Sequence, residues 1–319
     1  MIYTVYVTGC CGFMGRYVTL ACLNQGYYVI GVDKLTYAAN PDTITEFKTY
    51  GDHFKFIKSD INELDSLYDC EYVINLAAES HVDNSIINSK EFLHSNINGV
   101  QHLLELIRQK ARYKMPTLLH FSSDETYGDI AVGSHIETDL LKPSNPYSAT
   151  KAAADMLITA WARTFNIPHI IVRPTNNYGI GQYTEKLLPM ICKTYKLGKK
   201  LLLHNNGSPT RIWLHAKDTA DAIITIINSN IQNEIYNISG NIEITNLEMV
   251  KKVLTYIDGY PPTKSLINDF CDFSYKREGQ DVRYSLNDTK LRNLGWNNKC
   301  NLDNELPSIV EYYKNKFIW

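Results

Sequence analysis

The sequence predicts an α/β protein with a doubly wound parallel sheet and a second, smaller domain of mixed structure. Over the first 174 residues, short apolar and β-branched runs alternate with amphipathic helical patterns. A glycine-rich turn joins the first run to the first helical pattern, and the alternation ends after Arg173-Pro174. The chain has 319 residues, which is more than one compact core usually holds, so we expect two domains.

Six short runs are expected to form the strands of the sheet, and several are apolar enough to be buried on both faces. They are residues 2–7, 27–32, 54–57, 72–77, 117–122 and 169–173. Apolar residues recur at three- and four-residue spacing after the first run, between 92 and 110, and between 148 and 165, which predicts helices there. Strands that alternate with helices form right-handed crossovers, so the sheet should be parallel.

The chain loses this rhythm after residue 174, where Asn, Gly, Lys and Pro become more frequent. We expect one helix over 185–198, and then a helix and a strand within 213–240 that pack back on the first domain. The tail, 245–319, mixes short helices with loops. The predicted division is therefore a first domain over 1–174 and a second over 175–319.

Composition excludes several classes of protein. Hydrophobic residues make up 44% of the chain and charged residues 21%, and a net charge of −2 gives no reason to expect a nucleic-acid partner. No apolar run reaches the ~18–20 residues that span a bilayer, and no signal-like stretch opens the chain, so neither a membrane partner nor secretion is expected. The seven cysteines form no C-x-x-C pair, which predicts no metal site, no disulfide framework and a reducing, cytoplasmic compartment.

The first turn of the chain carries three glycines in a spacing that suits a dinucleotide. Gly9, Gly12 and Gly15 follow the first strand and open the first helix, where glycines allow a tight turn and a close approach to a pyrophosphate. Asp33 ends the second strand at the distance (~20 residues on) from which a carboxylate hydrogen-bonds an adenosine ribose. This context favours a Rossmann-type cofactor domain, and the alternative is a purely structural turn.

Asp33 also bears on the choice of cofactor, because its carboxylate would repel a 2′-phosphate. NAD is therefore favoured over NADP, although Lys34 and Arg16 lie nearby and weaken that inference. Two further strand ends are expected to contact the cofactor, the third at an adenine edge and the fourth where small side chains let the backbone approach. Their residues are Asp60 and Ile61, and Leu76, Ala77 and Ala78.

Tyr147 and Lys151 lie four residues apart on the helix that follows Asn145-Pro146, so both face the same way. A phenol is a poor base at neutral pH, with a pKa near ~10, and a neighbouring ammonium would lower that pKa. Three other pairs match the spacing: Tyr195 and Lys199, Tyr260 and Lys264, and Tyr312 and Lys316. Position favours the first pair, because it opens a helix of the parallel-sheet domain, whereas two prolines after Tyr260 argue against a helix there.

Asp124 and Glu125 follow the fifth strand, and ligands of parallel sheets bind beyond the carboxyl ends of the strands. Adjacent residues of a strand point to opposite faces, so the two side chains share one site only if the strand has ended and a turn re-aims them. Paired carboxyls in unlike environments can divide the acid and base roles. The alternative for this pair is an exposed acidic turn.

Five motifs occur in one order along the chain. They are Gly-x-x-Gly-x-x-Gly over 9–15, Asp33-Lys34-Leu35-Thr36-Tyr37-Ala38, Ala77-Ala78-Glu79-Ser80-His81-Val82-Asp83, Ser122-Ser123-Asp124-Glu125-Thr126-Tyr127-Gly128 and Tyr147-x-x-x-Lys151. In this combination, and over nearly its whole length, the chain resembles the extended short-chain dehydrogenase/reductase family, and within it the nucleoside-diphosphate-glucose 4,6-dehydratases. The Asp-Glu pair separates it from the related 4-epimerases, which typically have small residues there.

The resemblance implies a reaction and a role for each catalytic residue. Ser123 and Tyr147 would hold the C4 hydroxyl of glucose, Tyr147 would take its proton, and Lys151 would bind the nicotinamide ribose and lower the pKa of the tyrosine. Hydride would pass to a tightly held NAD that is regenerated in each turnover. Glu125 would remove the C5 proton, and a protonated Asp124 would donate to the C6 hydroxyl as it leaves as water.

The resemblance implies that the first domain binds NAD and that the second binds the sugar nucleotide. It also implies two sets of binding residues. The cofactor set is Gly9, Gly12, Phe13, Met14, Gly15, Asp33, Lys34, Thr36, Asp60, Ile61, Leu76, Ala77, Ala78, Ser80, Ser95, Tyr147, Lys151 and Asn177. The substrate set is Ser80, Ser123, Asn176, Lys186, Leu187, Arg211, Asn246 and Arg283. The two arginines suit a diphosphate because a guanidinium binds oxyanions bidentately, with a surface ion pair as the alternative for each.

The chain departs from the family pattern at three positions. Ser123 stands where Thr is usual, Gln280 where His is common beside the diphosphate, and Glu278 where the Arg-Pro-Gly turn has Pro. The hydroxyl survives at Ser123, so these departures bear on nucleotide binding more than on chemistry.

The resemblance further implies a homodimer formed through the helices around 92–110 and 148–165, and a product that feeds deoxysugar biosynthesis, for example that of rhamnose. Uracil and thymine differ by one methyl group, so UDP-glucose and dTDP-glucose both remain open as substrates. Two other functions also remain open. One is a 4-epimerase or decarboxylase on the same scaffold, and the other is a non-catalytic NAD-binding sensor, since a fold does not fix a function.

Overall fold

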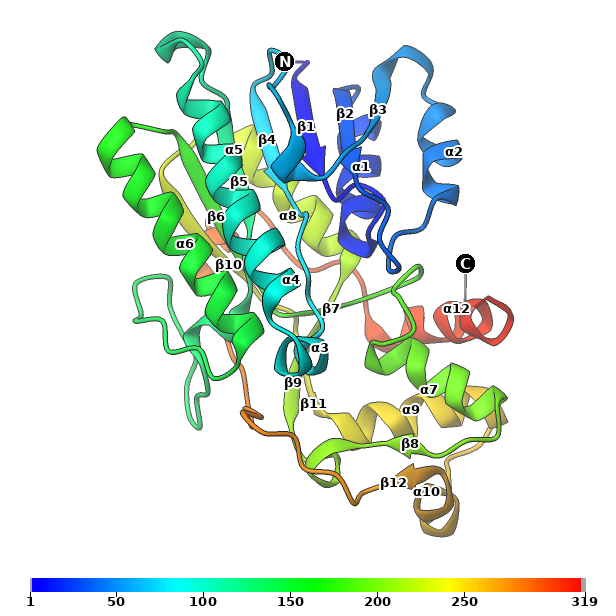
Figure 1. The fold of residues 1–319 in the computed structure, drawn as a ribbon. Helices are drawn as coiled ribbons and strands as arrows, with labels where there is room; N and C mark the ends of the chain where they lie inside the picture. The colour runs from blue at the N-terminus through cyan, green and yellow to red at the C-terminus, as the bar shows by residue number, and fades with distance from the viewer. Residues whose placement is uncertain (1, 317–319) are drawn as a thin grey trace.

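The computed structural model describes residues 2–316, and its larger lobe is built on a seven-stranded parallel sheet (Figure 1). The strand order is β10-β6-β5-β4-β1-β2-β3. From β1 the sheet grows through β2 and β3 on one side, and from β4 onward it grows on the other side, so the order switches between β1 and β4. The strands are β1 (Thr4–Thr8), β2 (Tyr28–Asp33), β3 (Phe54–Lys58), β4 (Tyr72–Asn75), β5 (Thr117–Phe121), β6 (His169–Pro174) and β10 (Glu234–Ile238). The predicted parallel, doubly wound sheet is therefore confirmed, and all six predicted strands lie in it.

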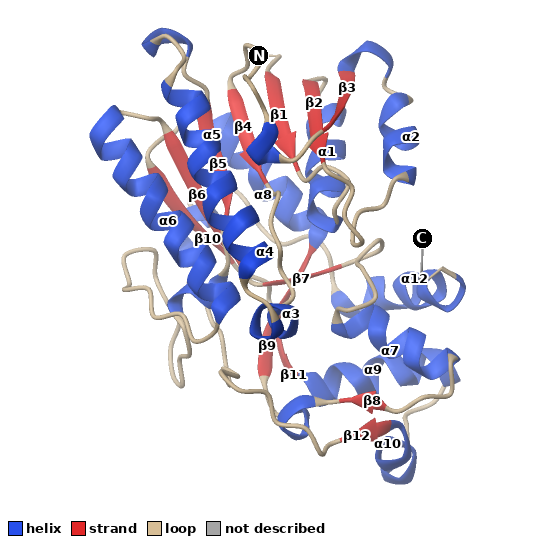
Figure 2. Ribbon diagram, in the orientation of Figure 1, coloured by secondary structure: helices blue, strands red, loops and turns tan. Residues whose placement is uncertain are grey.

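Helices cover both faces of this sheet (Figure 2). One face carries α1 (Phe13–Asn24), α2 (Asp42–Lys48) and α8 (Ala216–Ser229), and the other carries α5 (Gly99–Arg108) and α6 (Pro146–Phe165). Side chains alternate along each strand, so Val5 and Val7 pack in the core beneath α1 and α8, whereas Tyr6 packs in the core beneath α5 and α6. Burial on both faces explains why these strands read as continuous apolar runs in the sequence.

A smaller lobe lies beyond the carboxyl ends of the parallel strands (Figure 1). Its mixed sheet has the order β11-β9-β7, in which β11 runs antiparallel and β7 parallel to β9. These strands and the helices that share the lobe's core are β7 (Asn176–Tyr178), α7 (Leu187–Lys196), β9 (Thr210–His215), β11 (Ile242–Thr245), α9 (Asn246–Asp258) and α12 (Leu302–Asn315). Three shorter elements complete the lobe: β8 (Leu201–Leu202), α10 (Lys264–Phe270) and β12 (Cys271–Asp272). The short helix α11 (Thr289–Arg292) instead packs against β10 in the larger lobe.

The chain passes between the two lobes more than once. After β9 in the smaller sheet, α8 packs against α1 and β10 pairs with β6 at the edge of the large sheet. The chain then returns to the smaller lobe with β11. The predicted boundary at residue 174 stays a prediction, and the structure adds that the two lobes are interleaved along the chain.

The predicted helix over 92–110 is interrupted. It consists of α4 (Lys90–Phe92), the π-helical segment η3 (Leu93–Asn98) and α5, with α3 (Val82–Ile87) just before it. Within η3, the Asn96 side chain accepts a hydrogen bond from the Glu79 N–H at 2.9 Å and donates one to the Glu79 carbonyl at 3.0 Å. The wide turn thus ties this helix to the segment after β4, and π turns are frequent at functional sites.

Short 3₁₀ turns join several of these elements. They are η1 (Gly51–His53), η2 (Ile61–Glu63), η4 (Arg112–Lys114), η5 (Asp124–Tyr127) and η6 (His204–Gly207). Among the helices of residues 2–316, none combines the length and the apolar character that crossing a membrane requires.

Candidate active site

Two adjoining cavities lie beyond the carboxyl ends of the parallel strands, where open α/β sheets bind ligands. The larger has a volume of about 320 Å³ and reaches from the glycine turn to the end of β5 and the start of α6. The smaller lies toward the second lobe. They form one continuous cleft, because both are lined by Ser80, Glu125, Asn176, Asn177, Gln182, Glu185 and Lys186.

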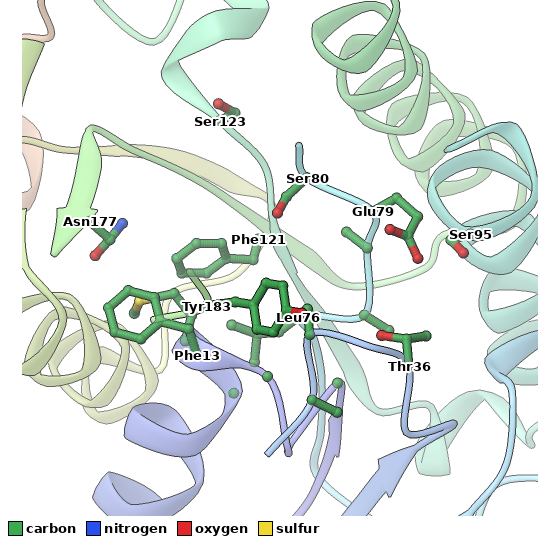
Figure 3. Close-up of a pocket in the computed structure, with 18 of the residues that line it drawn as sticks. Phe13, Thr36, Leu76, Glu79, Ser80, Ser95, Phe121, Ser123, Asn177 and Tyr183 are labelled. Carbon is green, nitrogen blue, oxygen red and sulfur yellow. The ribbon is translucent and has the colours of Figure 1, made fainter. Parts of the chain in front are cut away.

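The larger cavity gathers every residue that the sequence assigned to the cofactor, and the five predicted catalytic residues line it as well. Figure 3 shows Ser80, Ser123 and Asn177 around the cavity, with Phe13, Leu76 and Tyr183 together at one side. Thr36, Glu79 and Ser95 lie at the other side. The sequence reasoning did not name Tyr183 or Gln182, and it quoted Glu79 within a motif without giving it a role.

The glycine turn brings α1 into close contact with the start of the chain. A Cβ on Gly15 would lie 1.9 Å from the Gly9 carbonyl oxygen, and Gly9 itself has a φ of +68° and leaves no room for a Cβ beside Ala77. Gly12 is the N-cap residue of α1, and because it has no side chain it cannot cap the helix. The first N–H groups of the helix are therefore open toward the cavity. This cradle fits a pyrophosphate, whose charge the helix N-terminus favours.

Asp33 is held in one orientation at the end of β2. Its Oδ2 accepts a hydrogen bond from the Cys11 N–H at 2.9 Å, and its Oδ1 accepts one from the Leu35 N–H at 2.7 Å. Burial raises the pKa of this carboxyl, whereas the two backbone N–H groups and Lys34 oppose the rise. A fixed, buried carboxylate in this place suits a pair of ribose hydroxyls.

The two cations that weakened the preference for NAD are both paired with carboxylates. Lys34 Nζ lies 3.1 Å from Asp60 Oδ2, and the Arg16 guanidinium makes two hydrogen bonds of 2.7 Å with Glu46. The pKa of Asp60 is lowered to about 2 by hydrogen bonds from Asn62 and Lys34, which outweigh its partial burial. With their charges balanced, neither cation is free for a 2′-phosphate.

The cysteines of the glycine turn are buried packing residues. Cys10 and Cys11 are at most 1% exposed, and their sulfurs lie 3.8 Å apart. Their thiols and the Asp33 carboxylate would fall within metal-chelating distance of one another. However, the hydrogen bond to Cys11 and burial raise the pKa of Cys10 far above its usual value, which favours the thiol over the thiolate that metals need.

The acidic pair enters the cavity because β5 ends before it. The short turn η5 is capped by Ser123, whose Oγ accepts a hydrogen bond from the Glu125 N–H at 3.2 Å. Asp124 is 4% exposed, accepts a hydrogen bond from Ser123 Oγ at 3.2 Å, and its second oxygen has no partner among the described residues. Burial, followed by the charge of Glu125, raises the pKa of Asp124 to about 7.

Glu125 has a different environment from its neighbour. Its Oε2 accepts hydrogen bonds from Asn145 Nδ2 at 3.3 Å and from the Tyr284 hydroxyl at 3.4 Å, and it lines both cavities. The two adjacent carboxyls therefore share one cleft but differ in solvation and partners. Paired carboxyls in unlike environments can divide the acid and base roles.

Tyr147 and Lys151 lie on the first two turns of α6, which begins with a capping box formed by Asn145 and Ser148 and with Pro146 in its first turn. Burial, followed by the charge of Glu125, raises the pKa of Tyr147 above its usual value. The expected lowering by the lysine is therefore not seen here. Lys151 Nζ instead donates to the Phe121 carbonyl at 2.6 Å, and burial lowers the pKa of Lys151 to about 8.

Six of the eight predicted substrate residues line the smaller cavity. They are Ser80, Asn176, Lys186, Leu187, Arg211 and Asn246, whereas Ser123 lines the larger one. Lys186 Nζ donates to the Ser80 carbonyl at 2.7 Å. Arg211 Nη2 donates to the Asp281 carbonyl at 3.2 Å, and its guanidinium stacks over the ring of Tyr284.

Arg283 lies outside both cavities, which corrects its assignment to the substrate. Its guanidinium pairs with Glu243 at 2.5 Å and donates to the Gly133 carbonyl at 2.9 Å. The alternative weighed for it, an ion pair, is what the structure has. Arg277 occupies the cleft instead and pairs with Asp83 at 2.7 Å.

Other residues of the smaller cavity, among them His204 and Tyr284, were given no role by sequence reasoning. They come from loops far apart in the chain, so spacing does not reveal them. One sequence feature could have pointed to this part of the cavity. It is the turn Arg277-Glu278-Gly279, where glutamate replaces the proline of the family's Arg-Pro-Gly turn.

Comparison with known proteins agrees with this geometry. Residues 6–308 match the family model described as GDP-mannose 4,6 dehydratase. A probable dTDP-glucose 4,6-dehydratase of Sinorhizobium fredii is 36% identical over 332 residues, which cover 99% of this chain and 94% of the relative.

Two solved structures show the same fold with NAD bound. DesIV, a dTDP-glucose 4,6-dehydratase from Streptomyces venezuelae, superposes with a TM-score of 0.90 at 31% identity, over 97% of this chain and 96% of its own. A UDP-glucuronic acid 4-epimerase from Bacillus cereus, in complex with UDP-glucuronic acid and NAD, has a TM-score of 0.87 at 25% identity, over 98% and 99% of the two chains. From the family model and the full-length relatives together, we conclude that the chain belongs to the GDP-mannose 4,6 dehydratase family.

Proposed function

We propose that the protein is an NAD-dependent 4,6-dehydratase that converts UDP- or dTDP-glucose to the 4-keto-6-deoxy sugar nucleotide. The observation that carries the proposal is the pair Asp124 and Glu125, which shares one cleft with Tyr147 while the two carboxyls have different surroundings. An elimination of water needs an acid and a base at the same time, and this cleft supplies both.

The residues of the larger cavity fit NAD. Gly15 lets α1 pack directly on the turn, and Gly12 leaves the start of the helix uncapped at the cavity, which suits a pyrophosphate. Asp33 presents a fixed carboxylate, and Lys34 is already paired with Asp60. Tyr147 and Lys151 lie at the far end of the same cavity, beside the acidic pair. When bound, NAD supplies the hydride acceptor that oxidises C4 and the donor that reduces C6.

Tyr147 and Ser123 are proposed to hold the C4 hydroxyl, with the phenol taking its proton as C4 becomes a ketone. The two side chains interact, since a hydrogen bond with Ser123 lowers the pKa of Tyr147 against the larger effect of burial. The 4-ketone acidifies the C5 proton. Glu125 is proposed to remove that proton, because its carboxylate is oriented by Asn145 and Tyr284.

Asp124 is proposed to donate its proton to the C6 hydroxyl, which then leaves as water. A carboxyl whose pKa lies at about 7 is about half protonated at neutral pH, so it can act as an acid where an ordinary aspartate cannot. Its second oxygen is buried without a partner among the described residues, an unmet hydrogen-bonding capacity that a substrate hydroxyl would fill.

The smaller cavity is proposed to bind the nucleoside diphosphate. It holds three cationic side chains, Lys186, Arg211 and Arg277, and two of them are guanidinium groups suited to phosphate oxygens. The names of the relatives favour dTDP-glucose, and nothing in the cavity alone selects thymine over uracil. The product would be a precursor of deoxysugars such as rhamnose.

The proposal is tested by incubating the protein with UDP-glucose and with dTDP-glucose in deuterated water. Mass spectrometry should show a net loss of water and one solvent deuterium at C5 in the product. Unchanged hexose with both nucleotides would overturn the proposal, and simple inversion at C4 would favour the rival 4-epimerase. The Glu125→Gln variant separates these two reactions, because an epimerase would retain its activity.

We also propose that the protein works as a homodimer in the cytoplasm. Exposed apolar side chains lie on α3, η3 and α6, which pack against one another: Ile87 is 84% exposed, Met156 53% and Leu93 46%. Such a surface suits a second copy of the chain. The buried thiols of Cys10, Cys22 and Cys192 are consistent with a compartment where cysteines remain reduced.

A further inference from the structure

A row of three buried polar side chains crosses the centre of the large sheet. Thr8 pairs in register with Asn75, and Asn75 pairs in register with His120, so the three residues lie side by side on β1, β4 and β5. Each is at most 1% exposed. Buried polar groups are costly unless they are hydrogen-bonded, so the order of donors and acceptors along this row is constrained.

The hydrogen bonds along this row are donated in one direction, from the Ala77 backbone toward His120. The Ala77 N–H donates to Thr8 Oγ1 at 3.3 Å, and the Thr8 hydroxyl donates to Asn75 Oδ1 at 2.6 Å. This leaves the Asn75 amide nitrogen facing His120 Nδ1 at 3.1 Å. An amide nitrogen can only donate, so Nδ1 must carry a lone pair and no proton.

The other nitrogen of the imidazole then carries the only proton. Burial, together with the positive charges of Lys151 and Arg173, keeps the pKa of His120 well below its usual value, so the ring is neutral. A neutral ring with a bare Nδ1 has its proton on Nε2. Nε2 lies 3.4 Å from Lys151 Nζ, which itself donates to the Phe121 carbonyl at 2.6 Å.

We propose that Thr8, Asn75 and His120 are positioning residues for Lys151. The row fixes the imidazole so that its Nε2–H points at the lysine nitrogen, which favours the neutral amine over the ammonium. An ammonium has three donors and no acceptor, so it gains nothing from this N–H, whereas a neutral amine accepts it. The row thereby makes Lys151 release its proton more readily than burial alone would.

The remaining groups around Lys151 act in other ways. Asp155, one turn further along α6, favours the ammonium, but it is committed to an ion pair with Arg173 at 2.9 Å. Tyr147 lies one turn before Lys151, and the carboxyls Asp124 and Glu125 line the same cavity. Among these neighbours, His120 differs in that its tautomer is fixed by Asn75 and Thr8 in the sheet, which do not line the cavity.

The inference rests on the proposed function only in so far as that function assigns Lys151 a role beside Tyr147. A lysine that titrates near neutrality presents its charge to Tyr147, one turn before it on α6, only while it is protonated. The tautomer of His120 and the titration of Lys151 can both be measured without any turnover. Failure of the positioning role and failure of the proposed reaction are therefore distinguishable.

The first experiment measures the tautomer. Long-range ¹H–¹⁵N correlation spectra of the full chain, labelled in histidine and assigned by loss of one ring in His120→Gln, should show the Nε2–H form at neutral pH. Thr8→Val keeps the shape but removes the hydroxyl, and should shift the ring toward the other tautomer, whereas Thr8→Ser should not. An Nδ1–H ring in the unmodified protein, or an unchanged tautomer in Thr8→Val, would overturn the proposal.

The second experiment measures the titration of Lys151 with ε-¹³C-labelled lysine, assigned by loss of a signal in Lys151→Met. His120→Phe removes the N–H and should raise the pKa of Lys151 by about one unit, a tenfold gain in proton affinity. His120→Gln can offer an N–H in the same place and should restore the lower value. If His120→Phe does not fold, Thr8→Val should give a rise of the same sign, and an unchanged titration in the folded variants would overturn the inference.

Discussion

Asp124 combines near-complete burial with a second carboxyl at its side. Only 4% of the residue is exposed, and the charge of Glu125 adds to the cost of ionising it. Both effects act in the same direction, because each disfavours the anion. A residue with this pKa gives the chain an acid at neutral pH, and it also makes the folded state depend on pH.

Asp124→Asn should lower the rate of water loss by about 10²- to 10⁴-fold, because the amide cannot protonate the leaving hydroxyl. In the unmodified protein, the same rate should fall as the pH rises through about 7, where the acid form is lost. Mass spectrometry of the product at several pH values measures both effects. Asp65→Asn, at an exposed position, is the matched control, and equal losses in the two variants would contradict a role as the acid.

Asp124→Asn should also change stability in a pH-dependent way. The pKa in the folded state, about 7, lies above the ordinary 3.8, so the folded protein binds the proton more tightly and loses stability as the pH rises from about 4 to 7. The amide removes this loss. Urea unfolding should find the variant more stable at pH 8 by on the order of 2–4 kcal/mol, with the difference vanishing near pH 4. A difference that is constant with pH would argue against the raised pKa.

The residues that sequence could predict are those whose chemistry lies in a local pattern. The glycines follow β1, Asp33 ends β2 and the acidic pair follows β5, and a strand end fixes where such residues go. Arg277 shows the limit, because it reaches the cleft from a loop near the end of the chain and meets Asp83 only in the folded state. The family resemblance points to Arg283 instead, and no spacing rule separates two arginines of one loop.

At the scale of elements, the site depends on two helix starts. α1 approaches the glycine turn so closely that only hydrogen fits at Gly15, and α6 begins where Asn145 both caps the helix and contacts Glu125. Helix positions were predicted within a few residues from apolar spacing. The π-helical interruption at η3 was not, because it is stabilised by the pairing of Asn96 with a distant backbone segment.

Gly15→Ala should destabilise the protein by about 3 kcal/mol and weaken NAD binding, since the new methyl overlaps the Gly9 carbonyl and must push α1 away from the turn. Thermal unfolding and a fluorescence titration with NAD measure the two effects. Gly133→Ala is the control, because it has a φ of +83° but open space around it, and should cost only about 1 kcal/mol. Equal costs for the two would show that crowding at the turn is unimportant.

Asn145→Ser tests whether the start of α6 orients the proposed base. Serine caps a helix about as well as asparagine, so the free energy of unfolding should change by less than about 1 kcal/mol. The hydrogen bond to Glu125 is lost, and deuterium incorporation at C5 should slow by about tenfold. Asn301→Ser, at the cap of α12, makes the same exchange far from the cleft and should leave the rate unchanged.

For the whole molecule, the arrangement of apolar surface predicts self-association. The exposed side chains of α3, η3 and α6 lie on the side of the large sheet that α5 and α6 cover. None of these side chains comes from the second lobe, although α3 begins at Val82, which lines the smaller cavity.

Light scattering after size-exclusion chromatography should give the mass of two chains. The double variant Ile87→Asp with Met156→Glu should give the mass of one chain, because burying two carboxylates in an apolar interface is unfavourable. Val132→Asp, at a residue that is 87% exposed on another loop, should remain a dimer. A single-chain mass for the unmodified protein would contradict the prediction.

The interleaving of the two lobes has a consequence for synthesis. While the chain emerges from the ribosome, β6 appears well before its edge partner β10, and the whole of α7, β9 and α8 must follow in between. Until then the large sheet has an unpaired, apolar border and α1 lacks the helix that covers it. The nascent polypeptide should therefore depend on chaperones over this interval, and a message truncated at the lobe boundary should yield aggregates rather than a free-standing cofactor module.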